Sequence, residues 1–167
     1  MYNSLKENIS ALKKMFKNSA DFTVREMNLK GQCSIKSAII TIEGMCGKDT
    51  LALSLINPLL DYYFECQNPD EIFDTIKNTV LTSSEIVEFT TIDEAISFST
   101  SGFALLVVDG CSRMLAIGAQ GFSFRSVSEP ESEVVQRGCR EGFTEPLRIN
   151  MTLIRRRIKS PDLVFET

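Results

Sequence analysis

The stretch Phe103-Ala-Leu-Leu-Val-Val-Asp-Gly-Cys-Ser-Arg-Met-Leu-Ala-Ile-Gly-Ala119 decides the fold class of this chain. Its first six residues form one continuous apolar run, which predicts a strand. Asp109-Gly110 is a turn signal, and the apolar residues Met114, Leu115 and Ile117 follow in a second run. The pattern therefore predicts an antiparallel hairpin, to which the rest of the chain adds further strands and helices.

Three more strands are expected upstream of the hairpin, at residues 21–30, 33–43 and 85–90. In the second of these, apolar residues occupy both faces, so we expect it to be central and buried. In the first, the apolar phase shifts between Val24 and Met27, which indicates a bulge.

Helices are expected between these strands because each one begins with a capping signal. The expected helices, with their first-turn signals, are 3–18 (Ser4, Glu7), one from residue 50 (Asp49), 68–80 (Asn68, Pro69) and 91 to Gly102 (Thr91, Glu94). The helix from residue 50 is expected to end or kink at Asn57-Pro58. Strands and helices together predict an α/β domain. It has a mixed β-sheet of about five strands flanked by helices, followed by an extended connector and a C-terminal helix.

The helix expected at residues 3–18 is amphipathic, with lysines near its C-terminal end. Its apolar stripe either packs on the core of the domain or lies on an anionic membrane surface. The moderate charge of the helix favours packing on the core.

Residues 44–49, Gly-Met-Cys-Gly-Lys-Asp, are a glycine-containing loop between a strand and a helix. A phosphate-binding P-loop needs four residues between its glycines and a hydroxyl after the lysine, and this loop has neither. We expect a turn instead, with Asp49 as the cap of the next helix.

Composition excludes several classes of function. The formal net charge is −4 and the pI about 5.0, which argues against nucleic acid as a partner. The chain has no histidine, so zinc and non-haem iron lose their commonest ligand, and serine or cysteine nucleophiles lose their usual base. Its five cysteines are scattered without a C-x-x-C pair. We therefore expect no metal, no cofactor and no enzymatic activity.

The last third of the chain is rich in arginine and glutamate: residues 125–158 hold seven of the nine arginines. Arginine is favoured where forked donors must meet carboxylates or carbonyl oxygens in fixed geometry. A solvated helix with mixed surface charge is the alternative. The residues expected to form a structural or assembly motif are Arg125, Glu129, Pro130, Glu133, Arg137, Gly138, Arg140, Glu141, Gly142, Phe143, Glu145, Asn150, Arg155, Arg156 and Arg157.

These residues follow the pattern R-S-x-x-E-P-x-x-E, then R-G-x-x-E-G-F-x-E, then N-x-x-L-I-R-R-R. In this arrangement the chain resembles the A-subunit family of bacterial spore germinant receptors, the GerA family. Cys139 stands where that family usually has proline, so the turn after Gly138 is expected to be less rigid. A weaker resemblance covers roughly residues 20 to 122.

The resemblance implies a non-enzymatic part of a receptor in the inner membrane of the spore, with this region on the cytoplasmic side, facing the spore core. It implies assembly with receptor B and C subunits and other A subunits, and coupling of nutrient detection to ion release. It also implies that the membrane is reached through a C-terminal part outside this chain. Two alternatives stay open: the related sporulation protein SpoVAF, and a module that binds a small nutrient in a cleft beside residues 44–49 and the hairpin.

The resemblance divides the chain into an α/β subdomain at 1–122 and a connector with its helix at 123–167, which leads to a second subdomain absent from this chain. Thr144 is the expected N-cap of the last helix, and Leu147, Met151, Ile154 and Ile158 form its main apolar stripe. With the second subdomain missing, we expect exposed apolar surface here.

Overall fold

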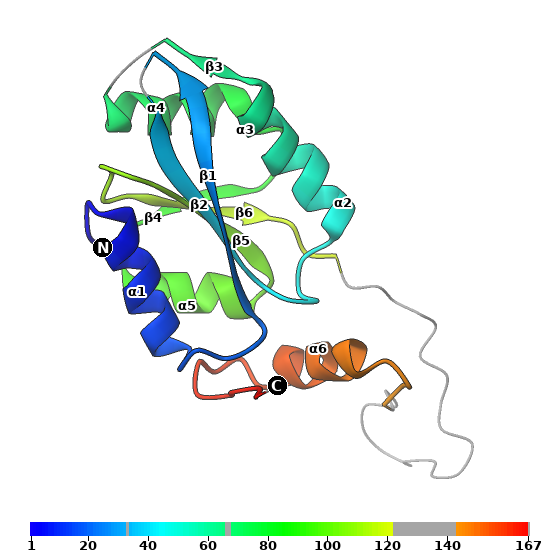
Figure 1. Cartoon of the computed structure of the whole chain (residues 1–167). Helices are drawn as coiled ribbons and strands as arrows, with labels where there is room; N and C mark the ends of the chain where they lie inside the picture. The colour runs from blue at the N-terminus through cyan, green and yellow to red at the C-terminus, as the bar shows by residue number, and fades with distance from the viewer. Residues whose placement is uncertain (33, 66–67, 122–142, 167) are drawn as a thin grey trace.

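The computed structural model describes residues 1–32, 34–65, 68–121 and 143–166. Within them, six strands form one sheet in the order β3-β1-β2-β5-β6-β4 (Figure 1). The strands are β1 (Phe22–Gly31), β2 (Ile35–Ile42), β3 (Tyr63–Phe64), β4 (Ile86–Phe89), β5 (Phe103–Val108) and β6 (Met114–Gly118).

The sheet is mixed, as predicted. β1 pairs with β3 in parallel, and the other four neighbouring pairs are antiparallel. All five predicted strands are present, including the hairpin of β5 and β6, whose turn has Gly110 at a φ of 88°. The sixth strand, β3, has only two residues and is too short to produce a periodic pattern.

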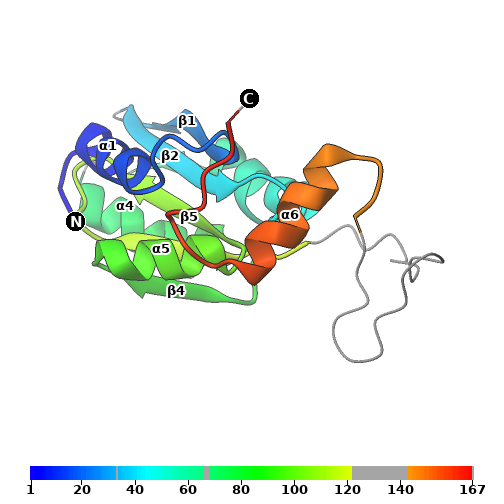
Figure 2. The ribbon, with the colours of Figure 1, turned by 90° about the horizontal axis from the view of Figure 1, so that it is seen from below.

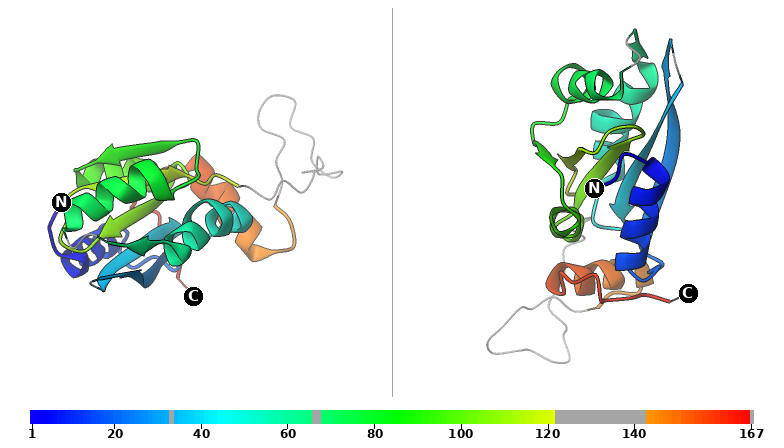
Figure 3. Two further views of the ribbon diagram at one scale, coloured as in Figure 1. Left: turned by 90° about the horizontal axis from the view of Figure 1, so that it is seen from above. Right: turned by 90° about the vertical axis from the view of Figure 1, so that its left-hand side faces the viewer.

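Helices cover both faces of the sheet (Figures 1 and 3). They are α1 (Leu5–Met15), α2 (Lys48–Leu51), η1 (Ala52–Ile56), α3 (Asn57–Asp61), α4 (Pro69–Thr75), η2 (Ile76–Val80), α5 (Ile92–Thr100) and α6 (Leu147–Arg157). One core lies between the sheet and the run from α2 to η2, and a second core lies between the sheet and α1 with α5. None of the helices in the described residues is long and apolar enough to cross a membrane.

The apolar stripe of α1 packs on the core: Leu5, Ile9 and Leu12 are buried against the sheet. This confirms the expectation that the helix belongs to the domain core.

The predicted bulge in β1 was wrong. Residues 22–29 pair with β2 in an unbroken register from Phe22–Ile42 to Leu29–Ile35. The apolar phase shifts because Phe22 and Val24 face the core under α1, whereas Met27 and Leu29 face the opposite core. The strand therefore changes which of its faces is covered while its pairing stays regular.

The prediction for the start of the helix after residue 47 was also wrong. The helix begins at Lys48 after Gly47, and no side chain caps it, so Asp49 lies inside the first turn. Of the two outcomes expected at Asn57-Pro58, an end or a kink, the structure shows no end: the π-helical segment η1 stands directly before this step, and α3 continues through it. In a π-helix the N–H of residue i+5 donates to the carbonyl of residue i; here the Asn57 N–H donates to the Ala52 carbonyl.

The last helix, α6, lies across one end of the sheet, and the chain then runs back towards the start of β1 (Figure 2; right-hand view of Figure 3). This placement brings the C-terminal segment beside the turn between α1 and β1.

Candidate functional site

The N-terminus of α6 is organised by Asn150, one of the predicted motif residues. Asn150 Oδ1 accepts a hydrogen bond from the Thr144 N–H at 2.7 Å, and its Nδ2 donates to the Thr144 carbonyl at 2.5 Å. The prediction that Thr144 is the N-cap was wrong, because the helix begins after Pro146. Asn150 therefore fixes how the chain enters the helix.

Arg155, the first of the three consecutive arginines, is completely buried, with a relative exposure of 0%. Its Nε donates to Asp21 Oδ2 at 2.8 Å and its Nη2 to Asp21 Oδ1 at 2.9 Å. This is the bidentate pairing that the planar guanidinium favours.

The remaining guanidinium donors of Arg155 hold the segment that follows α6. Nη1 donates to the Ser160 carbonyl and Nη2 to the Leu163 carbonyl, both at 2.9 Å. The guanidinium also lies 5.2 Å from the centre of the Phe165 ring. A single buried cation thus joins Asp21, before β1, to the segment that follows α6.

Ser19 completes the contacts between the two ends of the chain. Its hydroxyl donates to Asp21 Oδ1 at 2.6 Å and accepts from the Phe165 N–H at 2.9 Å. The Ala20 N–H donates to the Phe165 carbonyl at 2.9 Å. We refer to Ser19, Asp21, Arg155, Ser160, Leu163 and Phe165 as the Arg155 junction.

Contacts outside the Arg155 junction continue the attachment of α6 to the domain. Lys17 and Asp162 form an exposed ion pair at 2.7 Å, and Arg148 pairs with Glu43. Gly44, at a φ of 82°, packs directly against the Thr152 side chain. The helix is therefore held at its middle as well as at its C-terminal end.

The apolar stripe predicted for α6 was only partly right. Leu147 and Ile158 are exposed, with relative exposures of 68% and 48%, whereas Leu153 is the leucine that packs inward. Phe143, before the helix, is 73% exposed. The expected exposed apolar surface near this helix is thus present.

The structure places the predicted motif residues unevenly. Asn150 and Arg155 have the structural roles described above, Arg156 is half-buried, and Phe143, Glu145 and Arg157 are exposed. The other nine predicted residues lie outside the described residues: Arg125, Glu129, Pro130, Glu133, Arg137, Gly138, Arg140, Glu141 and Gly142. Sequence reasoning missed Ser19 and Asp21, which carry no local signal because their partner is more than 130 residues away.

The glycine-containing loop at residues 44–49 is packed between two other segments. The Gly47 N–H donates to the Ala119 carbonyl at 2.8 Å, and a β carbon on Gly47 would meet the Gly121 backbone at 3.2 Å. Thr152 covers the other end at Gly44. The glycines of this loop therefore serve close packing between segments.

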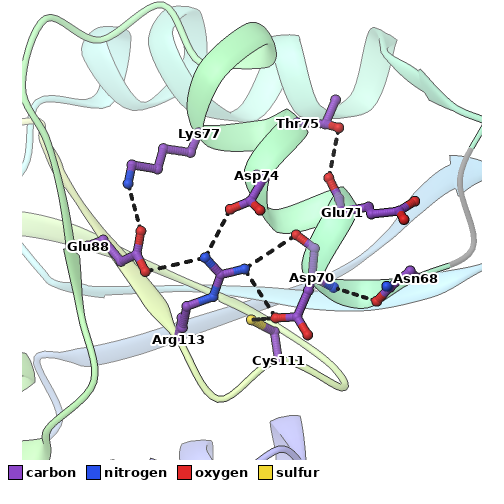
Figure 4. Close-up of polar contacts among 9 residues, drawn as sticks. All are labelled: Asn68, Asp70, Glu71, Asp74, Thr75, Lys77, Glu88, Cys111 and Arg113. Atoms are coloured by element: carbon purple, nitrogen blue, oxygen red, sulfur yellow. Dashed lines mark hydrogen bonds and ion pairs between the residues drawn. The ribbon is translucent and has the colours of Figure 1, made fainter.

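A second polar cluster surrounds Arg113, between α4, β4 and the hairpin of β5 and β6 (Figure 4). Arg113 contacts Asp70 at 3.1 Å, Asp74 at 2.9 Å and Glu88 at 3.4 Å, and it lies 4.4 Å above the Phe73 ring centre. The cluster ties α4 to β4 and to the hairpin. Among the described residues, no group of three or more acidic or cysteine side chains is arranged to hold a metal ion.

Hydrogen bonds hold two carboxyl groups of this cluster ionised. The pKa of Glu88 is lowered, first by the Lys77 ammonium at 2.6 Å and also by Arg113. The pKa of Asp70 is lowered by its hydrogen bonds with Cys111 and Arg113. In contrast, burial raises the pKa of the Cys46 thiol to about 12, so this thiol stays protonated.

Replacing Arg113 by methionine is expected to destabilise the domain by about 1 kcal/mol near neutral pH, mainly through the lost contact with the Phe73 ring. The pKa values of Asp70 and Glu88 are lower in the folded protein than their ordinary values of 3.8 and 4.5. Their ion pairs therefore contribute to stability at pH values above these ordinary pKa values, and this contribution is lost as the pH falls below them. Urea unfolding over a pH series measures this. If the difference in unfolding free energy between parent and variant stays constant into acid, the ion-pair part of the prediction is contradicted. The control is Lys77→Met, which removes one cation beside Glu88 and leaves all contacts of Arg113 in place.

Comparison with known proteins relates the chain to spore proteins. The family described as "Bacillus/Clostridium GerA spore germination protein" matches residues 10–167. Spore germination protein KA of Bacillus subtilis (strain 168) is 36% identical over 163 residues, which cover 98% of this chain and 30% of that protein. The uncharacterized membrane protein YfkQ of the same organism is 32% identical over 158 residues, 94% of this chain and 30% of that protein.

Two further matches bear on the alternatives. Stage V sporulation protein AF of Bacillus subtilis (strain 168) is 30% identical over 122 residues, 73% of this chain and 24% of that protein. The crystal structure of the N-terminal domain of the A subunit of the Bacillus megaterium spore germinant receptor GerK3 has a TM-score of 0.67 at 26% identity. It matches 98% of this chain and 58% of that chain. The chain thus spans less than a third of the length of these curated relatives.

Proposed function

The chain belongs to the GerA family of Bacillus/Clostridium spore germination proteins, and from this membership we propose that it is the N-terminal part of a germinant receptor A subunit. Its likeness to the GerK3 A-subunit domain over nearly the whole chain supports this proposal. In such a receptor the domain acts in assembly and in coupling nutrient detection to ion release.

The observation that carries the assembly role is the position of α6. The Arg155 junction fixes the helix to the domain through a fully buried cation, while Leu147 on the same helix stays 68% exposed. A helix that is rigidly held and still presents an apolar side chain is suited to contact another protein surface. The proposed partners are the receptor B and C subunits and other A subunits.

The proposed location is the spore inner membrane, with this domain on the side facing the spore core. The relative YfkQ is a membrane protein, and this chain covers only 30% of it. Membrane-spanning segments would then lie in the remaining length of such proteins, outside the part that this chain matches. The division at residues 122 and 123, with a second subdomain after residue 167, stays a prediction.

Stage V sporulation protein AF is the second candidate, because it matches 73% of the chain at 30% identity. A nutrient site beside residues 44–49 is less favoured, since Gly44 and Gly47 pack against other segments of the chain.

Replacing Leu147 by glutamate in the full-length protein is expected to weaken receptor assembly without unfolding the domain, because the side chain is mostly exposed. The measurements are the amount of A subunit in spore membranes, the amount of partner subunit that co-purifies with it, and nutrient-triggered germination. Normal A-subunit levels with reduced co-purification and slower germination are expected.

The matched control is Leu53→Glu, which alters a leucine of similar exposure, 66%, on η1. This variant is expected to behave like the parent. Normal co-purification and germination of the Leu147 variant would refute the proposed role of α6.

A further inference from the structure

One flank of α1 carries a concentration of lysines. Lys6, Lys13 and Lys14 fall within an arc of about 100° when successive residues are rotated as in an α-helix, and Ser10 lies within the same arc; Lys17 follows just after the helix ends. We call these five residues the lysine flank. The apolar stripe beside it is buried in the core, whereas the side chains of the flank are exposed, as are Glu7 and Met15 of the same helix.

The lysine flank borders a hollow of about 430 Å³. Its polar lining consists of Lys6, Ser10, Lys13, Lys14, Asn18 and Glu26. Five of these side chains present hydrogen-bond donors, and Glu26 is the one carboxylate. Such a lining is chemically suited to phosphate oxygens.

Charge sets this flank apart from the rest of the chain. Residues 3–18 carry a net charge of +3, which leaves −7 for the remainder. Lys17 is paired with Asp162, but within the described residues Lys6, Lys13 and Lys14 have no carboxylate at ion-pair distance. An anionic surface would therefore attract this flank and repel most other faces of the domain.

We propose that the lysine flank of α1 binds anionic phospholipid headgroups at a membrane surface. The inference rests on the membrane location proposed above, which keeps the domain close to such a surface. The exposed lysines have long, flexible side chains, which suit a layer of mobile headgroups better than one fixed soluble anion.

The test is co-sedimentation of the chain with two kinds of vesicle, one of phosphatidylcholine alone and one of phosphatidylcholine mixed with phosphatidylglycerol. Binding is expected only to the anionic vesicles, and added salt should weaken it. In the double variant Lys13→Glu and Lys14→Glu, the partition coefficient should fall by about tenfold or more.

The matched control is the double variant Lys30→Glu and Lys36→Glu, which makes the same change of charge at two exposed lysines on β1 and β2. It should retain most of the binding, and circular dichroism should show that both variants are folded. Absence of binding to anionic vesicles, or equal loss in the two variants, would overturn the proposal. So would displacement by inorganic phosphate but not by chloride at equal ionic strength, which would indicate a site for a soluble anion. None of these outcomes bears on the co-purification experiment with Leu147, so the two proposals fail separately.

Discussion

Replacing Asp21 by alanine is expected to lower the free energy of unfolding by about 3–5 kcal/mol, because it leaves a buried cation without its counter-ion. Arg155 has a relative exposure of 0% and would lose the acceptors of its Nε and one Nη2 hydrogen bond. The Ser160 and Leu163 carbonyls would remain, but neither neutralises the charge. Urea denaturation of the two proteins measures the difference.

The control for this variant is Asp162→Ala, which breaks the ion pair with Lys17. Both partners of that pair are more than half exposed, at 56% and 75%, so its loss should cost far less stability than the loss of Asp21. If the two variants lose similar amounts of stability, burial does not strengthen the Asp21–Arg155 pair.

Replacing Gly44 by alanine is expected to destabilise the domain by about 2–3 kcal/mol, since a φ of 82° is unfavourable for any residue with a β carbon. The added β carbon would also overlap the Thr152 hydroxyl, which displaces α6 from the turn after β2. Thermal unfolding of the variant measures the loss of stability.

A second substitution separates the two causes. In the double variant Gly44→Ala and Thr152→Ala, the overlap is removed but the unfavourable φ remains. Part of the stability should therefore return. If Thr152→Ala restores nothing, the contact with α6 contributes little and backbone strain explains the whole effect.

The parts of the fold that the sequence predicts are those with local signals. The hairpin was predicted from its apolar runs and Asp109-Gly110, and the helix at residue 92 from the capping box of Thr91 and Glu94, both of which the structure confirms. The two-residue strand β3 and the π-helical turn before Pro58 have no such signal. They depend on how distant elements pack.

The site was only partly predictable for the same reason. The arginine-rich run at residues 155–157 contains the buried arginine, but composition could not tell which of the three is buried. That depends on Asp21, which lies directly before β1 and 134 residues from Arg155. In the sequence, Asp21 looks like an ordinary polar residue at the start of a strand.

The Arg155 junction also explains why arginine stands at this position. Lysine would supply one charged centre, whereas the guanidinium donates to both oxygens of Asp21 and to two carbonyls of the segment after α6. Buried ion pairs often add little net stability compared with apolar packing, so their value is commonly in fixing one arrangement. For this domain we infer that the arrangement being fixed is that of α6.

The most direct test is a double-mutant cycle with Asp21→Ala, Arg155→Met and the two combined, followed by urea denaturation. The account predicts a coupling free energy above about 2 kcal/mol, with the double variant more stable than the sum of the single losses implies. A coupling within about 0.3–0.5 kcal/mol of zero would mean that the residues act independently, and would contradict the claim that this pair holds α6 to the domain.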